Sequence, residues 1–499
     1  MNALTEAPAV AQFALSRQRE VVDALRAVLP AHCVLFNEED TRPYECDGLA
    51  AYRQLPMVVV LPENEAQISG ILKTCARLNV RIVPRGAGTG LSGGAMPIAD
   101  GVVVSTARLN KILKLDPYSR TAVVQPGVRN LAISEAAGPH GLYYAPDPSS
   151  QIACTIGGNV AENSGGVHCL KYGLTVHNVI EVEILTIDGE WLTFGSRGLD
   201  APGYDLLALI HGSEGLLGIV MQVTVKLLPR PQLARVVLAA FDSVEAAGSA
   251  VAAIIAAGLV PAGLEMMDKL AIEVAEAYCH AGYPLDAAAI LLCEVDGNSV
   301  DVAAQIEAVS SVLQQAGASM LRVSQDEAER LRFWLGRKSA FPAIGRIAPD
   351  YFCMDGTIPR KRLAEVLEDI SALSREFNLP VANVFHAGDG NLHPLIAFDA
   401  NDDDQMRRAA QLGSRILAKC VAVGGTVTGE HGVGVEKLNE MCLQFSSAEL
   451  ESFFTLKKAF DPKGLLNPGK AVPSLHRCAE FGAMHVHGGK LPHPELERF

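Results

Sequence analysis

The segment RGAGTGLSGGAMP, residues 85–97, distinguishes between two kinds of dinucleotide-binding fold that this chain could adopt. Gly88, Gly90 and Gly93 match the GxGxxG spacing of a nicotinamide-binding turn. That turn also requires a helix to begin within the loop, so that the pyrophosphate meets the helix N-terminus. Here Pro97 and the strand-forming sequence GVVVST follow almost at once. The loop therefore predicts an α+β fold in which backbone amides of a loop, and not a helix end, hold a dinucleotide.

Two further segments with few bulky side chains lie in the same half of the chain. Residues 146–173 contain Gly-Gly-Asn and Asn-Ser-Gly-Gly clusters, and residues 212–220 read GSEGLLGIV before a predicted strand. One such loop is ordinary turn chemistry, but three in one domain favour a large dinucleotide lying across it, and FAD fits. The predicted FAD-binding residues are Pro84, Arg85, Gly86, Gly88, Thr89, Gly90, Leu91, Ser92, Gly93, Pro146, Asp147, Ser150, Thr155, Gly157, Gly158, Asn159, Asn163, Gly165, Gly166, Tyr172, Glu214, Gly218, Ile219 and Asn467.

A second motif pair carries metal-binding chemistry. HAGDGNLH at residues 386–393 places two imidazoles around a turn, and GEHGVG at residues 429–434 supplies a carboxylate. Two histidines and one carboxylate form a three-ligand set with open coordination positions. Each histidine by itself is more often structural, but the combination of His386, His393 and Glu430 predicts a site for one divalent cation, zinc or manganese, with iron left open. His431, next to Glu430, is the candidate general base.

Composition limits the class of protein. The chain has 499 residues, 49% of them hydrophobic, which favours two or three globular domains. Its formal net charge of -14 argues against nucleic acid or an anionic membrane as a general partner. The N-terminus resembles no secretory signal, so a cytoplasmic location is the expectation. The uncharged run at residues 246–264 is interrupted by glycine and proline and favours a helix packed on a sheet over a membrane span.

The eleven cysteines are scattered singly, without a CxxC pair. This pattern predicts reduced, buried thiols, and it excludes the usual spacing of iron–sulfur ligands. The cysteines of this chain therefore supply no iron–sulfur cluster that could accept electrons.

Four parts are predicted along the chain. Residues 1–54 form a helix and lead-in, and residues 55–231 form an FAD-binding domain that closes at Pro-Arg-Pro. Residues 232–445 alternate strands and helices, as repeated βαβ-type modules around an antiparallel sheet do, and form a substrate-binding cap. Residues 446–499 form a helical segment and tail. The clearest periodic patterns predict helices at 17–29, 64–78, 300–316 and 360–378, and strands at 57–62, 80–84 and 354–359.

Taken together, these motifs resemble the FAD-linked oxidoreductases of the vanillyl-alcohol oxidase and p-cresol methylhydroxylase fold, over nearly the whole chain. The similarity is greatest to the flavin-bearing D subunits of bacterial glycolate oxidases. It rests on PRGAGTGLSGG (84–94), the segment 145–178, FHAGDGNLHPL (385–395), and the tail sequences RCAEFGAMHVH (477–487) and PELERF (494–499).

This resemblance implies a PCMH-type FAD-binding domain, a cap of ferredoxin-like repeats and a noncovalent FAD. In the covalent branch a histidine of the glycine-rich loop carries the flavin, and residues 85–97 contain none. The resemblance also implies His386, His393 and Glu430 as metal ligands and His431 as the base. It assigns Arg337, and with it Lys338, to the substrate carboxylate. By the same resemblance, Leu395 stands where relatives that accept 2-hydroxyglutarate use asparagine, so a small monoacid is favoured.

The expected reaction is oxidation of a small 2-hydroxy acid, glycolate to glyoxylate, with D-lactate as the alternative substrate. The expected partners are a second flavin-type subunit and an iron–sulfur subunit, which would place the protein at the periphery of the plasma membrane. Direct oxidation by oxygen stays open. Two other classes compete: a non-haem iron oxygenase, which also uses two histidines and a carboxylate, and a noncatalytic flavin-binding subunit.

Overall fold

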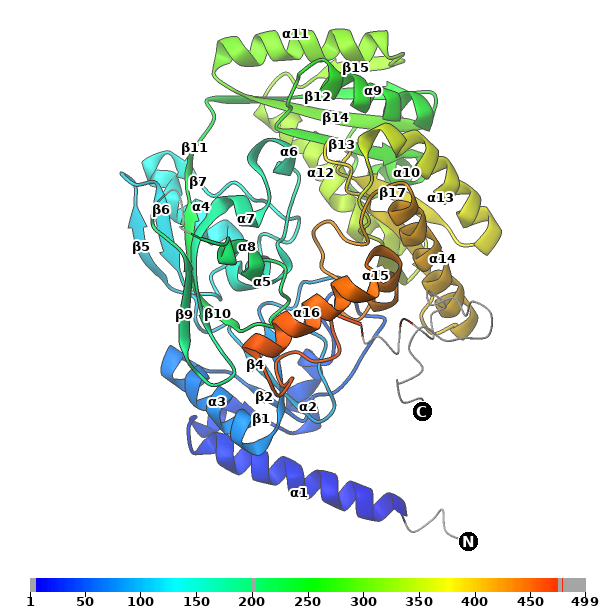
Figure 1. The fold of residues 1–499 in the computed structure, drawn as a ribbon. Helices are drawn as coiled ribbons and strands as arrows, with labels where there is room; N and C mark the ends of the chain where they lie inside the picture. The colour runs from blue at the N-terminus through cyan, green and yellow to red at the C-terminus, as the bar shows by residue number, and fades with distance from the viewer. Residues whose placement is uncertain (1–5, 199–202, 474–477, 479–499) are drawn as a thin grey trace.

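A four-stranded sheet forms the lower part of the molecule in the computed structural model, which describes residues 6–198, 203–473 and 478 (Figure 1). Its order is β1-β2-β4-β3, with β2, β4 and β3 parallel. Every residue of β2 and β4 is buried, as expected for parallel strands covered on both faces. The strands are β1 Val34–Leu35, β2 Val58–Val60, β3 Arg81–Arg85 and β4 Gly101–Ser105; the helices of this part are α1 Glu6–Arg26, α2 Glu38–Thr41 and α3 Glu65–Leu78.

A five-stranded antiparallel sheet of order β5-β6-β10-β8-β9 stands beside it, with a short ribbon of β7 and β11. Two glycine-rich segments connect its strands: residues 146–173 precede β8, and residues 212–220 lead into β10. The strands are β5 Ile112–Asp116, β6 Thr121–Val124, β7 Leu142–Tyr143, β8 Val179–Leu185, β9 Trp191–Gly195, β10 Ile219–Lys226 and β11 Leu228–Pro229; the helices are α4 Asn130–Ala137, α5 Ile156–Glu162, α6 Cys169–Tyr172, α7 Thr175–Asn178 and α8 Leu206–Ile210.

A seven-stranded antiparallel sheet forms the upper part, in the order β15-β12-β14-β13-β17-β18-β16 (Figure 1). Strands β12 to β15 form one module and strands β16 to β18 a second. Numbered within each module, the order is 4-1-3-2 followed by 2-3-1. Two ferredoxin-like modules, as predicted, thus share one sheet through the β13–β17 pair. The strands are β12 Leu233–Phe241, β13 Gly263–Asp268, β14 Ala289–Gly297, β15 Met320–Val323, β16 Asp350–Cys353, β17 Val381–Phe385 and β18 Pro394–Phe398. The helices are α9 Val244–Ala256, α10 Lys269–Cys279, α11 Ser299–Gln315, α12 Glu327–Ala343, α13 Leu363–Phe377 and α14 Asp403–Ala422.

The two faces of this sheet have separate cores. Along β12, Val237 and Phe241 pack with α9 and α13, whereas Val236 and Leu238 pack with α10 and α12 on the opposite face. Alternation along a strand sends successive side chains to opposite faces. The face that carries α10 and α12 is the one turned toward the first two sheets (Figure 1).

The second module lacks a fourth strand among the described residues. After α14 the chain instead forms a loop, in which Thr426 bridges Thr357, and this loop delivers Glu430 and His431. Helices α15 Leu438–Gln444 and α16 Ser447–Phe460 then return to the first sheet, where Leu466 bridges Ile82. The predicted C-terminal helical segment thus packs against the half that is predicted to bind FAD (Figure 1).

Most periodic patterns predicted the observed elements, but several details were wrong. Residues 354–359 are not a strand; β16 ends at Cys353, and Asp355 is instead a buried acceptor for loop hydrogen bonds. The first helix begins at Glu6, before the predicted start. Strand β1, within the predicted lead-in, pairs with β2. The remaining division into four parts stays a prediction, and most of the predicted tail lies outside the described residues.

The expectation of reduced, buried cysteines needs correction. Cys442 and Cys478 form a disulfide across 36 residues, which joins α15 to the tail. Cys46, Cys169 and Cys279 are only partly buried. In the part of the chain that the structure describes, no helix is long and apolar enough to cross a bilayer. The uncharged run at 246–264 forms most of α9 and the start of β13, as expected.

Candidate active site

A cavity of about 480 Å³ lies between the FAD-binding half and the cap. Its volume is within the usual range for cofactor sites. Residues from all three glycine-rich segments line it, and Lys338, His393, Glu430 and His431 line its cap side. The predicted cofactor-binding residues on its wall are Pro84, Arg85, Gly86, Gly88, Thr89, Gly90, Leu91, Ser150, Thr155, Gly157, Gly158, Asn159, Glu214, Gly218 and Ile219.

The other predicted cofactor residues do not line the cavity. The Ser92 hydroxyl donates to the His431 carbonyl at 2.9 Å, and the Asn467 amide donates to the carbonyls of Gly94 and Glu214. Gly165 lies against Glu430, where a Cβ atom would clash with the carboxylate. These residues hold the loops together.

The rest of this group makes contacts of its own. Gly93 packs on Val435 and Gly166 on Asp147, the carbonyl of Pro146 accepts from Asn130, Asp147 binds His168, Asn163 accepts from the backbone of Val176, and Tyr172 donates to Asp296.

The cavity wall fits a dinucleotide. The Thr155 hydroxyl is buried and has no hydrogen-bond partner among the described residues, although it lines the cavity. A buried hydroxyl without a partner is costly, so a polar ligand atom is expected there. Gly86 and Gly158 lie on either side of this hydroxyl, and a Cβ at Gly86 would clash with it. Glycine at position 86 therefore allows the first glycine-rich loop to pack closely against Thr155.

His386, His393 and Glu430 come together as predicted. His386 follows β17 and His393 precedes β18, so the hairpin between these paired strands brings both imidazoles to one end of the sheet. Glu430 Oε1 lies 3.2 Å from His386 Nε2 and 3.1 Å from His393 Nε2. The three ligand atoms lie within 4.8 Å of one another. His393 and Glu430 line the cavity, whereas His386 does not.

This donor set fits a divalent cation. Both ring nitrogens of His393 are buried. Nδ1 has no hydrogen-bond partner among the described residues, and Nε2 lies 3.1 Å from Glu430 Oε1 and 3.6 Å from Asp355 Oδ1 without the geometry of a hydrogen bond. Burial disfavours a charged imidazole at position 386, but the carboxylates of Glu265 and Glu430 outweigh it and raise the pKa of His386 well above its ordinary value. A metal cation between His386 and Glu430 would take the place of that proton.

Glu265 orients His386, the first candidate ligand. Its Oε1 lies 2.7 Å from His386 Nδ1, and its Oε2 accepts from Arg337 Nε at 2.8 Å. A carboxylate on the second nitrogen fixes the tautomer and orientation of a metal-binding imidazole. The sequence pattern of β13 gave no sign of this role, because Glu265 is a single acid in an apolar strand.

We expect Glu265→Gln to weaken metal affinity by about 10- to 100-fold, the usual effect of losing such a partner. Titration of metal-free protein with zinc in competition with a chromophoric chelator measures this affinity. Glu273→Gln, on the exposed side of α10, is the control and should bind as the parent does. Parental affinity in the Glu265→Gln protein would show that His386 needs no carboxylate.

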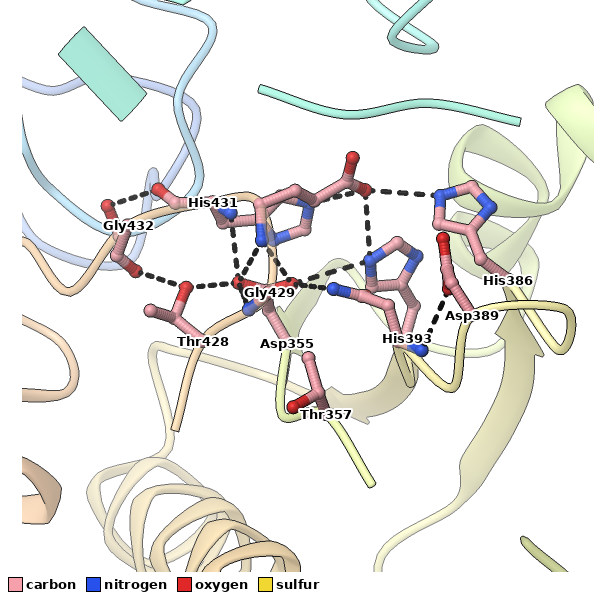
Figure 2. A network of polar contacts seen from close by, with 12 residues as sticks. Asp355, Thr357, His386, Asp389, His393, Thr428, Gly429, His431 and Gly432 are labelled. Atoms are coloured by element: carbon pink, nitrogen blue, oxygen red, sulfur yellow. Dashed lines mark hydrogen bonds and ion pairs between the residues drawn. The ribbon is translucent and has the colours of Figure 1, made fainter. Parts of the chain in front are cut away.

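Asp355 shapes the loop that carries Glu430 and His431 (Figure 2). This fully buried carboxylate accepts the backbone N–H groups of Gly429, Glu430 and His431, the last at 2.9 Å. Thr428 and the Asn391 side chain also donate to it. The loop after α14 therefore folds around one acid that follows β16, the first strand of the second module.

His431 meets the requirements of a base at this site. Its ring stacks on His393 with centroids 4.9 Å apart, and its Nε2 lies 3.7 Å from Glu430 Oε1. Burial lowers the pKa of His431 to about 4, so the imidazole is neutral at pH 7 and able to accept a proton.

Arg337 and Lys338 lie on different sides of α12. Arg337 is 1% exposed, is paired with Glu265 and does not line the cavity. Lys338 lines the cavity together with Phe341 and Pro342, the positions three and four residues later on the same helical face. The structure thus brings Lys338, and not Arg337, to the cavity. Leu395 is buried in the core of the sheet and does not line the cavity.

The fold, the cavity and the donor set define a class of FAD-dependent oxidoreductases, and comparison with known proteins agrees. Residues 56–195 match the model described as "FAD binding domain", and residues 230–471 match "FAD linked oxidases, C-terminal domain". The chain belongs to the FAD-linked oxidase family.

Individual relatives cover almost the whole chain. It is 63% identical over 479 residues to glycolate oxidase subunit GlcD of Escherichia coli strain K12, which covers 96% of each protein. It is 31% identical to a D-lactate dehydrogenase of Anaerostipes hadrus, over 91% of this chain and 98% of that protein. A solved structure of p-cresol methylhydroxylase has the same fold, with a TM-score of 0.77 at 17% identity over 92% of this chain and 98% of that one.

Proposed function

We propose that this protein oxidises glycolate to glyoxylate with a noncovalently bound FAD and a divalent metal ion. The observation that carries the proposal is that His431, two metal-type ligands and Lys338 open onto the same cavity as the glycine-rich segments. The 63% identity to a glycolate oxidase subunit supports the choice of substrate. The cavity contains no histidine from residues 85–97, which supports a noncovalent flavin.

Each residue has a defined part in this reaction. Lys338 binds the substrate carboxylate, and His386, His393 and Glu430 would hold the cation beside the substrate hydroxyl. His431 accepts the hydroxyl proton at Nε2, the ring nitrogen nearer Glu430. When bound, the flavin accepts the C2 hydride and the cation lowers the pKa of the hydroxyl. Asp355 and Glu265 keep the base and the first ligand in position.

D-lactate is the second candidate substrate, because the Anaerostipes hadrus relative is a D-lactate dehydrogenase. A non-haem iron oxygenase, the alternative with the same three metal ligands, would not need the FAD-binding domain that this chain contains. The described residues hold no cluster of cysteine ligands. We therefore propose that the electrons pass to an external acceptor. This acceptor would be an iron–sulfur subunit, which acts with a second flavin-type subunit at the membrane periphery. The cytoplasmic location stays a prediction.

Anaerobic mixing of the purified chain with glycolate, D-lactate, L-lactate and D-2-hydroxyglutarate tests the proposal. Bleaching of the flavin absorbance reports reduction directly and needs no partner. We expect glycolate to reduce the flavin fastest. Faster reduction by D-lactate would favour the second candidate, and no reduction by any of the four acids would reject the function.

Lys338→Met is expected to raise the KM for glycolate by about 10- to 100-fold, the loss of one charge-assisted hydrogen bond, while metal content stays unchanged. Steady-state assays with an artificial electron acceptor measure this. Lys361→Met, which removes a lysine that does not line the cavity, is the matched control. An unchanged KM in the Lys338 variant would remove Lys338 from the carboxylate site.

A further inference from the structure

The Glu162 carboxyl lies where two loops of the cavity wall meet. Glu162 is the last residue of α5 and lines the cavity. A Cβ atom at Gly94, in the first glycine-rich loop, would lie 2.6 Å from Glu162 Oε1. A Cβ atom at Gly432 would overlap Oε2. Because Gly432 directly follows His431, this carboxyl lies beside both the predicted FAD loop and the proposed base.

Hydrogen bonding distinguishes Glu162 from its acidic neighbour. Glu214 accepts the backbone N–H groups of Val433 and Gly434 at 2.7 and 2.8 Å. Such donors stabilise a charged carboxylate. Glu162 Oε2 is buried and has no hydrogen-bond partner among the described residues. Of the two acids, Glu162 is therefore the one that lacks support for a negative charge.

The nearby cations are engaged elsewhere. Lys437 Nζ donates to the Gly432 carbonyl at 2.9 Å, and Lys470 Nζ donates to the Met96 carbonyl and to Asn467 Oδ1. Burial, and then the charge of Glu214, raise the pKa of Glu162 well above its ordinary value. A carboxyl that keeps its proton in a buried site can donate a hydrogen bond.

We propose that Glu162 is an uncharged hydrogen-bond donor to the bound FAD and that this bond makes the flavin easier to reduce. The proposal rests on the placement of FAD in this cavity. Transfer of a hydride breaks the C2–H bond of the substrate and adds two electrons and one proton to the flavin, which leaves it more negative. The hydroxyl proton goes to His431, and Glu162 keeps its own. A neutral donor favours that added charge, whereas a carboxylate would oppose it.

The midpoint potential of bound FAD in Glu162→Gln and Glu162→Leu tests the role. Gln is neutral and keeps an N–H donor, so its potential should match that of the parent. Leu removes the donor and should shift the reduction equilibrium about tenfold toward oxidised flavin, which is about 30 mV for a two-electron couple. A higher potential in the Gln variant would mean that Glu162 is ionised, and a parental potential in the Leu variant would mean that no such bond exists.

Matched variants at Glu181 control for loss of a glutamate elsewhere. Glu181 lies on β8, binds Thr224 and Arg197, and does not line the cavity, so its Gln and Leu variants should keep the parental potential. Potentials measured against redox dyes with a chemical reductant need no substrate. They therefore test Glu162 even if glycolate proves the wrong substrate, whereas purified parent without FAD would reject the cavity assignment itself.

A second measurement covers the case in which Glu162→Leu loses its flavin. The infrared difference spectrum between reduced and oxidised protein should contain the C=O band of a protonated carboxyl that shifts on flavin reduction. This band should be absent from Glu162→Gln. A parent spectrum without any such band, or a Gln variant that retains it, would overturn the proposal.

Discussion

His431→Ala is expected to bind FAD and metal normally and yet reduce its flavin about 100- to 10,000-fold more slowly with glycolate. The side chain lines the cavity beside the proposed ligand Glu430, and its ring packs on His393. Its backbone N–H, which anchors the loop on Asp355, survives the substitution. The loop and its glutamate should therefore keep their places while the proton acceptor is lost.

Anaerobic stopped-flow mixing measures this rate, with flavin and metal content determined on the same preparation. His32→Ala removes an exposed histidine outside the cavity and is the control. Added imidazole should partly restore the rate of the His431→Ala protein, which a packing defect would not allow. A rate close to that of the parent would show that another group takes the proton.

The motifs predicted those parts of the site that are formed by residues close together in the sequence. HAGDGNLH and GEHGVG each place their ligands beside glycines, so the local sequence contains both the donors and the turns that present them. The glycine-rich loop was distinguished from a nicotinamide-binding turn by the strand that follows it, and the structure has β4 there. The order of strands and helices likewise predicted the paired modules of the cap.

The missed residues act through contacts between distant segments. Glu265 reaches His386 only because β13 pairs with β17, and Asp355 reaches His431 across 76 residues. Neither contact follows from the local pattern around a single acid. The choice between Arg337 and Lys338 depended on which side of α12 faces the cavity, and tertiary packing decides that rotation. The disulfide was missed because its cysteines form no spacing motif.

His393→Ala is expected to abolish reduction of the flavin by substrate while the flavin stays bound. The loss should be the largest among the variants of the site, because it removes both a ligand and the cation that the ligand holds. Cations at such sites stabilise the developing alkoxide by several kcal/mol. The loops that are predicted to contact FAD lie in the other half of the molecule, so retention of flavin is expected.

Removal of the metal by a chelator should reproduce this defect in the parent protein. The chelated parent and the His393→Ala protein should then respond differently to added cation. Zinc or manganese should restore activity to the chelated parent, whose three ligand atoms still lie within 4.8 Å of one another. It should restore little to His393→Ala, because two ligands bind a divalent ion too weakly to replace three. Elemental analysis of active protein supplies the remaining measurement. One equivalent of metal per chain agrees with the proposed mechanism, whereas active protein without metal would leave His386, His393 and Glu430 as a buried hydrogen-bonding cluster with His431 working unaided.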